Sequence, residues 1–219
     1  MAGILGDVGN REDLLAGAVR CLYTKGYART TARDIAAASD VSLAAIGYHY
    51  RSKEALLNAA LIQAIGEWGA ELEHALAAET DPTAEPLEQF EATWERILAS
   101  FDTHRQLWAA TFEVFAQIDR APEVRQFLAD ALQQGRLGLA SLFQHIDAGA
   151  DVRSAWVVGS FYQALLTGVL AQWLADPEHA PSGHDLAEAL RTILAAVTPV
   201  TPVGARATAA RGGPVVAEG

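Results

Sequence analysis

The sequence predicts an all-α protein of about nine helices, with an N-terminal helix-turn-helix domain and a C-terminal helical domain. Apolar residues recur at helical spacing along most of the 219 residues, while no segment shows the sustained two-residue alternation of a sheet. A hydrophobic fraction of 51% is ample for a packed core. We therefore expect domains at residues 1–51 and 52–197, followed by a tail at residues 198–219.

Three helices are predicted in the first domain. Residues 11–25 carry leucine, alanine and valine on one face, and Gly26 is suited to end this helix. Thr31 is a suitable N-cap for a helix that ends near Ala38, as is Ser42 for a helix over residues 43–50. Two short helices about a small turn form a helix-turn-helix, whose second helix can enter the DNA major groove. The local pattern therefore favours DNA binding.

Residues 11–57 also carry a set of motifs at specific spacing. They are Gly26-Tyr27, Thr30-Thr31, Asp34-Ile35-Ala36, Val41-Ser42, Ile46-Gly47-Tyr48-His49-Tyr50 and Ser52-Lys53-Glu54-Ala55-Leu56. In this pattern the chain resembles the tetracycline-repressor (TetR) family of one-component transcriptional regulators. It differs at Asp40, where glycine is usual, at Tyr50, where phenylalanine is usual, and at Gly47, which is often tyrosine. The resemblance implies a homodimeric repressor that binds a palindromic operator and is released by a small molecule.

The helix-turn-helix offers groups for two kinds of DNA contact. Amides at a helix start bind phosphate, where Thr31 adds a hydroxyl, and Lys53 is placed to meet a second phosphate. Residues 42–45 would contact base edges through apolar groups and one hydroxyl. The predicted DNA contacts are Thr31, Arg33, Ser42, Leu43, Ala44, Ala45, Tyr48, His49 and Lys53, with Arg29 as an alternative to Arg33. For any single one of these, a solvated residue at a helix end is the alternative interpretation.

The charge distribution is uneven along the chain. The net charge is −11, yet the first 58 residues hold seven basic and six acidic groups, including both lysines. Nearly all of the negative charge therefore belongs to the remainder. This asymmetry suggests a DNA-facing end and a body that polyanions avoid, although a solvated acidic surface on any soluble domain would look the same.

Six further helices are predicted downstream, separated by proline, glycine or aspartate. They cover residues 52–78, 87–103, 105–118, 122–146, 151–175 and 185–197. The segment from Ser154 to Ala175 is uncharged and long enough to span a membrane, but its polar residues and acidic flanks favour a buried or interface helix. The tail from Thr198 is rich in proline, glycine and alanine, which predicts disorder.

A dimer interface is predicted on the last two helices. Ser160, Ala164 and Gly168 form a stripe of small side chains at helical spacing, around which Trp156 and other apolar residues can pack. We expect residues 151–175 and 185–197 to form the homodimer interface, with contacts at Ser160, Ala164, Gly168 and Trp156.

Aromatic residues are frequent between Phe90 and Phe143, which predicts an apolar core that also encloses a ligand cavity. Core filling is the alternative for each residue taken alone. The predicted ligand contacts are Trp94, Trp108, Phe112, Glu113, Gln117 and Phe143, with Glu113 and Gln117 as polar anchors. The effector itself is an unidentified small molecule.

The sequence offers no catalytic constellation. The six histidines never show the paired spacing of a helical metal site, and we predict no catalytic residue, metal or cofactor. A single cysteine and the lack of a signal peptide suggest a cytoplasmic protein that does not insert in a membrane. The alternatives to a ligand-released repressor are an activator or ligand-independent regulator of the same fold and, less favoured, a helical enzyme or a ligand-binding protein without DNA activity.

Overall fold

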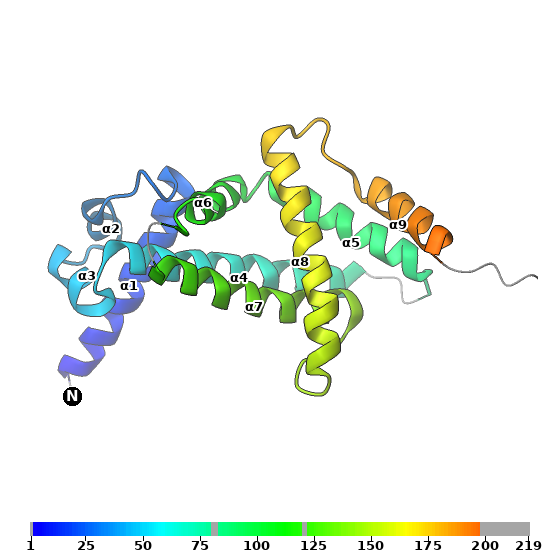
Figure 1. The fold of residues 1–219 in the computed structure, drawn as a ribbon. Coiled ribbons are helices and arrows are strands. Elements are labelled where there is room, and N and C mark those ends of the chain that lie inside the picture. Colours follow the sequence, from blue (N-terminus) through cyan, green and yellow to red (C-terminus); the bar gives the residue numbers. More distant parts are fainter. Residues whose placement is uncertain (1, 80–82, 120–121, 198–219) are drawn as a thin grey trace, which may run out of the picture.

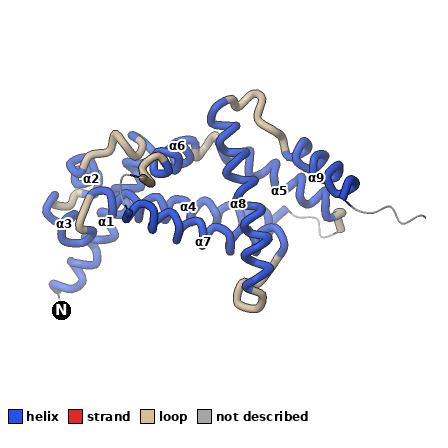
Figure 2. The backbone as a smooth tube through the Cα atoms, viewed as in Figure 1, coloured by secondary structure: helices blue, strands red, loops and turns tan. Residues whose placement is uncertain are grey.

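The computed structural model describes residues 2–79, 83–119 and 122–197 and is all-helical within them, which confirms the predicted fold class. Nine helices are described, and no strand occurs in these three ranges (Figures 1 and 2). Their bounds are α1 Ala2–Lys25, α2 Ala32–Ser39, α3 Leu43–Tyr50, α4 Lys53–Glu79, α5 Pro86–Phe101, α6 Arg105–Phe115, α7 Pro122–Gln144, α8 Val152–Ala175 and α9 Gly183–Val197. The first helix begins well before the predicted Arg11. The predicted tail lies outside the described residues.

Helices α1, α2 and α3 pack around a small apolar core. Its fully or almost fully buried members are Leu14, Ala18, Leu22, Tyr27, Ile35, Ile46 and Tyr50. Helix α1 approaches α2 so closely at Gly17 that an added Cβ would lie 2.8 Å from the Ser39 Cβ. Glycine at this position therefore sets the distance between the two helices.

Helix α4 links this N-terminal unit to the rest of the molecule. Figure 1 shows it running from α1–α3 towards the far end of the protein, with α7 alongside it. Its N-terminal half buries Leu56, Leu57, Ala60 and Leu61, and its C-terminal half buries Trp68 and Leu72. One continuous helix thus contributes to both hydrophobic parts, which share a single core cluster.

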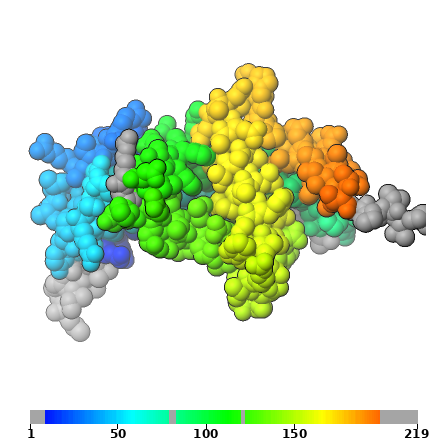
Figure 3. All heavy atoms as spheres, viewed as in Figure 1, coloured from blue at the N-terminus to red at the C-terminus, as the bar shows by residue number. Residues whose placement is uncertain are grey.

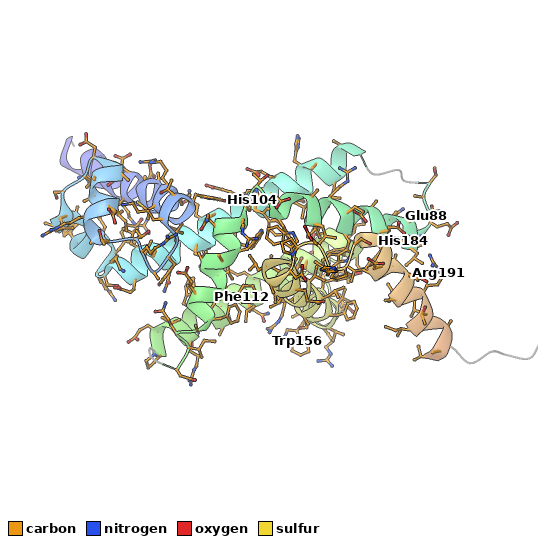
Figure 4. The ribbon with its side chains drawn as sticks, turned by 90° about the horizontal axis from the view of Figure 1, so that it is seen from above. Glu88, His104, Phe112, Trp156, His184 and Arg191 are labelled. Carbon is orange, nitrogen blue, oxygen red and sulfur yellow. The ribbon has the colours of Figure 1, made fainter. Side chains whose placement is uncertain are left out.

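The C-terminal part consists of two helix pairs with α6 beside them. Helix α8 crosses α7 with its backbone in direct contact, since a Cβ built at Gly159 would overlap the carbonyl group of Arg136. Helix α9 lies on α5, where His184 Nδ1 is 3.0 Å from Glu91 Oε1 and the His184 amide donates to Glu95 Oε1. Figure 4 shows His184 at the opposite end of the molecule from α1–α3.

Helix α8 is long and apolar enough to cross a membrane by length and composition alone. In this structure it packs against α7 and α6 through a buried face that includes Tyr162, Leu166 and Trp173. Its other face exposes Val152, Trp156, Val157 and Phe161, and Figure 3 shows this helix, in yellow, at the surface of the molecule. The burial of one face agrees with the expected core or interface helix.

Candidate nucleic-acid interface and cavity

The start of α2 is fixed by a reciprocal capping box. The Thr31 amide and hydroxyl donate to Asp34 Oδ2 at 2.9 and 2.8 Å, and the Asp34 amide donates to Thr31 Oγ1. Lys25 lies 2.5 Å from Asp34 Oδ1. The Lys25 ammonium and the two Thr31 donors hold the pKa of Asp34 well below its usual value. The Thr31 hydroxyl, predicted to meet phosphate, thus already serves the cap.

The turn between α2 and α3 contains a left-handed residue. Asp40 has φ 56° and ψ 32°, a conformation that aspartate adopts more readily than most residues. The amide of the next residue, Val41, donates to the Ala36 carbonyl at 3.2 Å and closes the end of α2. Asp40 therefore performs the backbone role that a glycine would have in this turn.

Helix α3 separates a buried face from an exposed one. Ile46 and Tyr50 point into the core, and the Tyr50 hydroxyl donates to the Arg11 carbonyl at 2.9 Å. Tyr48, on the opposite face, is 75% exposed, and Leu43 in the first turn of the helix is 48% exposed. Ser42 makes no side-chain capping bond, so its hydroxyl is not engaged at the helix start. Of the remaining predicted contacts on α3, Ala44 is exposed, Ala45 is half-buried, and His49 is half-buried with its ring 4.9 Å from that of Tyr48.

Lys53 lies next to the start of α2 in space. Its ammonium donates to the Thr30 carbonyl at 3.2 Å and lies 3.4 Å from Glu54 Oε1. Thr30 directly precedes Thr31, and Arg33 is exposed in the first turn of α2. The two phosphate contacts predicted separately from sequence, Thr31 and Lys53, therefore lie beside each other at the start of α2.

A cavity of about 430 Å³ lies among α4, α6, α7 and α8. Of the predicted ligand contacts, Trp108 and Phe112 line it, and Trp94, Glu113, Gln117 and Phe143 do not. Trp94 and Phe143 belong to an aromatic cluster, in which Phe143 stacks on Tyr162 with ring centroids 4.0 Å apart. The aromatic lining residues are Trp68, Trp108, Phe112, Phe115 and Phe127.

Glu113 lies on the side of α6 that faces the N-terminal unit. Its Oε2 accepts a hydrogen bond of 2.7 Å from the Ala28 amide, and its carbonyl accepts one from Gln117. The structure thus places Glu113 at the junction between the two parts of the chain instead of in the cavity, and Gln117 bonds back to the end of α6. The sequence did not predict this position, because α6 is apolar enough to be buried on two sides. The spacing of its residues does not indicate which of these sides lines the cavity.

The loop before α2 is also held from other directions. The Tyr27 hydroxyl donates to Asn58 Oδ1 on α4 at 2.7 Å, and burial raises the pKa of Tyr27 to about 12. On the neighbouring part of α1, Tyr23 is hydrogen-bonded to His104 at 3.0 Å. Figure 4 shows His104 and Phe112 along α6, between the N-terminal unit and the rest of the molecule. Helix α6 therefore contacts both the cavity and the N-terminal unit.

The proposed dimer face is partly exposed. On α8, Trp156, Ala164 and Gly168 are exposed, while Ser160 is half-buried and donates to the Trp156 carbonyl. Of the other apolar residues expected to pack around the stripe, Leu166, Val169 and Trp173 are instead buried within the subunit. The structure adds large exposed apolar residues on the two helices: Val152, Val157, Phe161, Ile193, Leu194 and Val197.

Comparison with known proteins finds two family models that match this chain. Residues 14–60 match the family model described as "Bacterial regulatory proteins, tetR family", and residues 85–199 match that of the "Tetracyclin repressor-like, C-terminal domain". No curated protein matches the sequence.

Solved structures share the fold. The multidrug binding protein EbrR in complex with imidazole has a TM-score of 0.59 at 24% identity, over 88% of this chain and 97% of that one. A transcriptional regulator from Streptomyces coelicolor A3(2) has a TM-score of 0.60 at 21% identity, over 84% and 97%. A TetR-family regulator from Mesorhizobium loti has a TM-score of 0.60 at 16% identity, over 87% and 97%. With both family models matched in order along its length, the chain belongs to the TetR family of bacterial regulatory proteins.

Proposed function

We propose that this protein is a cytoplasmic transcriptional repressor that binds a palindromic operator as a homodimer and leaves it when a small molecule occupies the cavity. The observation that carries the proposal is the exposed side of α3, with Leu43 and Tyr48, together with Lys53 beside the start of α2. Together they supply what a helix-turn-helix needs, an exposed helix for the major groove and cations for the flanking phosphates.

Base recognition by this surface would rest on few groups. The α3 face offers Ser42, Leu43 and Ala44 but no bidentate arginine or asparagine. We therefore expect specificity to come largely from thymine methyl contacts, from the spacing of the two half-sites and from DNA shape.

Release by a small molecule is supported by the position of α6. Trp108, Thr111 and Phe112 line the cavity, while Glu113 on the same helix holds the loop that precedes α2. A ligand that shifts α6 would alter the placement of the N-terminal unit and so the distance between the two α3 helices of a dimer. EbrR, whose fold is similar, is described as a multidrug binding protein and has been solved with imidazole and with proflavin.

The dimer would form through α8 and α9. Their exposed apolar side chains, which include Trp156 and Phe161, form a surface whose exposure to water is unfavourable. Pairing with the same surface of a second copy would bury it around a two-fold axis, which matches the symmetry of a palindromic operator.

The test begins with selection of bound fragments from genomic DNA, followed by mobility-shift titration of the recovered operator. We expect the wild-type chain to shift the operator in the presence of excess non-specific DNA, and Tyr48→Ala to weaken this binding at least tenfold. Arg96→Ala, which removes a cation from α5, outside both the α3 surface and the proposed dimer helices, should bind as the wild type does. Equal binding by the Tyr48 variant and the wild type would contradict the assignment of α3 as the recognition helix.

A further inference from the structure

The described cavity lining contains an acidic residue but no basic one. Among the described residues that line it, no side chain is basic, and Glu73 is the acidic member. Arg136 is adjacent in sequence to the lining residue Gly135, but it is not part of the lining, and its Nη1 donates to Gln133. The other polar groups are uncharged: hydroxyls and amides such as Thr111 and Gln163, and the indole N–H of Trp108, which is buried and has no hydrogen-bond partner within the described part of the chain. A buried anion would find no opposite charge here and would keep the full cost of its desolvation.

The mouth of the cavity runs between α4 and α7. On α4 the lining residues Ile62, Gly66, Gly69 and Glu73 are four, three and four positions apart, so they form one stripe along the helix. On α7 the exposed lining residues Gln134, Gly138 and Ser141 form a matching stripe. Solvent-exposed lining residues on both helices indicate that the cavity opens along this line.

Glycines form much of this mouth without being required for helix packing. A Cβ built on Gly66, Gly69 or Gly138 would meet no atom within 4 Å, in contrast to Gly17 and Gly159, where neighbouring backbone leaves no room. Glycine in a helix interior is less favourable than alanine, so these three positions weaken their helices without a gain in close packing. What they provide is open space beside the cavity.

From the lining and the glycines we infer that the cavity takes an apolar organic molecule without negative charge, which enters through the glycine slot. The glycine slot is defined as Gly66 and Gly69 of α4 and Gly138 of α7. This inference rests on the proposed function, because it names the chemistry and the route of the proposed effector. Aromatic walls from α4, α6 and α7 supply the apolar contact.

The charge selection is tested with two fluorescent probes that share one skeleton. N-phenyl-1-naphthylamine is uncharged, and 1-anilinonaphthalene-8-sulfonate adds a sulfonate. We expect the uncharged probe to bind the full-length protein at least tenfold more tightly, as measured by fluorescence titration. Gln134→Lys, which places a cation at the mouth, should narrow this difference several-fold. Equal or tighter binding of the sulfonate by the wild type would overturn the inference.

The route is tested by stopped-flow mixing with the uncharged probe. Gly66→Leu and Gly138→Leu should each slow association at least tenfold, since the new side chain stands in the slot. The matched controls are Ala70→Leu on α4 and Ala129→Leu on α7, which are exposed residues outside the lining. Association rates that are equal in the slot and control variants would overturn the proposed route.

Operator binding is measured on the same variants, which separates this inference from the proposed function. All four leucine variants should shift operator DNA as the wild type does, because none alters the α2–α3 surface. Circular dichroism checks the helical content of each variant. Probe binding with the expected charge preference, together with a failure to bind any DNA, would contradict the proposed function and leave the ligand class supported.

Discussion

Glu113 on α6 and Ala28 in the loop before α2 are joined by a hydrogen bond of 2.7 Å, although 85 residues separate them in the sequence. Glu113 directly follows Phe112, which lines the cavity. The side chain next to the proposed effector site therefore holds the loop that leads into the helix-turn-helix. The Glu113 carboxylate is therefore a single group whose removal tests the proposed coupling between effector and DNA.

Glu113→Ala should weaken the response to effector. Loss of one hydrogen bond to a charged group should lower the free energy of unfolding by roughly 1–2 kcal/mol. We also expect a smaller ratio between the operator affinities measured without and with effector. Urea denaturation and mobility-shift titration provide the two measurements. Glu123→Ala, at an exposed position of α7, is the control. An unchanged ratio would exclude this bond from the coupling.

Lys53→Ala should change the salt dependence of DNA binding. With two or three phosphate contacts per subunit, log affinity against log salt should have a slope of about −4 to −5 for the dimer. Removal of one contact per subunit should make the slope less negative by about 2. Fluorescence anisotropy on the selected operator at several salt concentrations measures both slopes. A wild-type slope near zero would rule out the contact scheme.

Asp34→Asn should destabilise the protein in a pH-dependent manner. The pKa of Asp34 is lowered in the folded state by Lys25 and Thr31, so its ionised form stabilises the fold above the usual aspartate pKa. That contribution is lost as the pH falls below about 4 towards the lowered value. The difference in melting temperature between wild type and variant should be largest near neutral pH and should shrink in acid. A difference that does not depend on pH would show that the carboxylate charge contributes nothing.

Two glycine substitutions should have opposite effects on stability. At Gly159 an alanine Cβ would overlap the Arg136 carbonyl, so Gly159→Ala should cost about 1–3 kcal/mol as α8 moves away from α7. At Gly138 the space is open, and Gly138→Ala should stabilise α7 by about 0.5–1 kcal/mol. Denaturant titrations of the two variants give the comparison. Destabilisation of similar size at both sites would contradict the difference in packing.

Gly168→Arg should convert the proposed dimer to monomers. The exposed Gly168 lies in the apolar face of α8, where an arginine would place a charge in a paired interface. Sedimentation velocity should show the monomer mass for this variant. The control Ala129→Arg, at an exposed position of α7, should show the dimer mass. A variant that sediments as a dimer would move the interface elsewhere.

The helices and their caps could be predicted because their signals are local. Thr31 and Ser42 both stand at the N-cap as predicted, although only Thr31 accepts a bond from an amide of the first helical turn. Asp40 adopts the left-handed turn conformation for the same kind of local reason. The start of the first helix was missed because residues 2–10 contain Gly3, Gly6 and Gly9, and glycine is unfavourable inside a helix.

The cavity and the junction could not be predicted in the same way. Trp108 and Phe112 line the cavity, but Trp94 and Phe143 have the same chemistry and fill a packed aromatic cluster. Which aromatic residue borders open space depends on where helices diverge, a property of tertiary structure. The glycines Gly66 and Gly138 did offer a signal, because glycine inside a helix calls for a reason.

Lys53 donates to the Thr30 carbonyl in the free protein, and this contact affects how DNA would be engaged. A long lysine side chain normally loses much rotational freedom when it is fixed on a phosphate. Here the ammonium is already oriented beside the start of α2 by the Thr30 carbonyl and by Glu54 Oε1 at 3.4 Å, so a phosphate would compete with a carboxylate for it. Much of the conformational entropy of the Lys53 side chain is therefore lost during folding. Operator binding would then only replace the present acceptors of its ammonium with a phosphate oxygen.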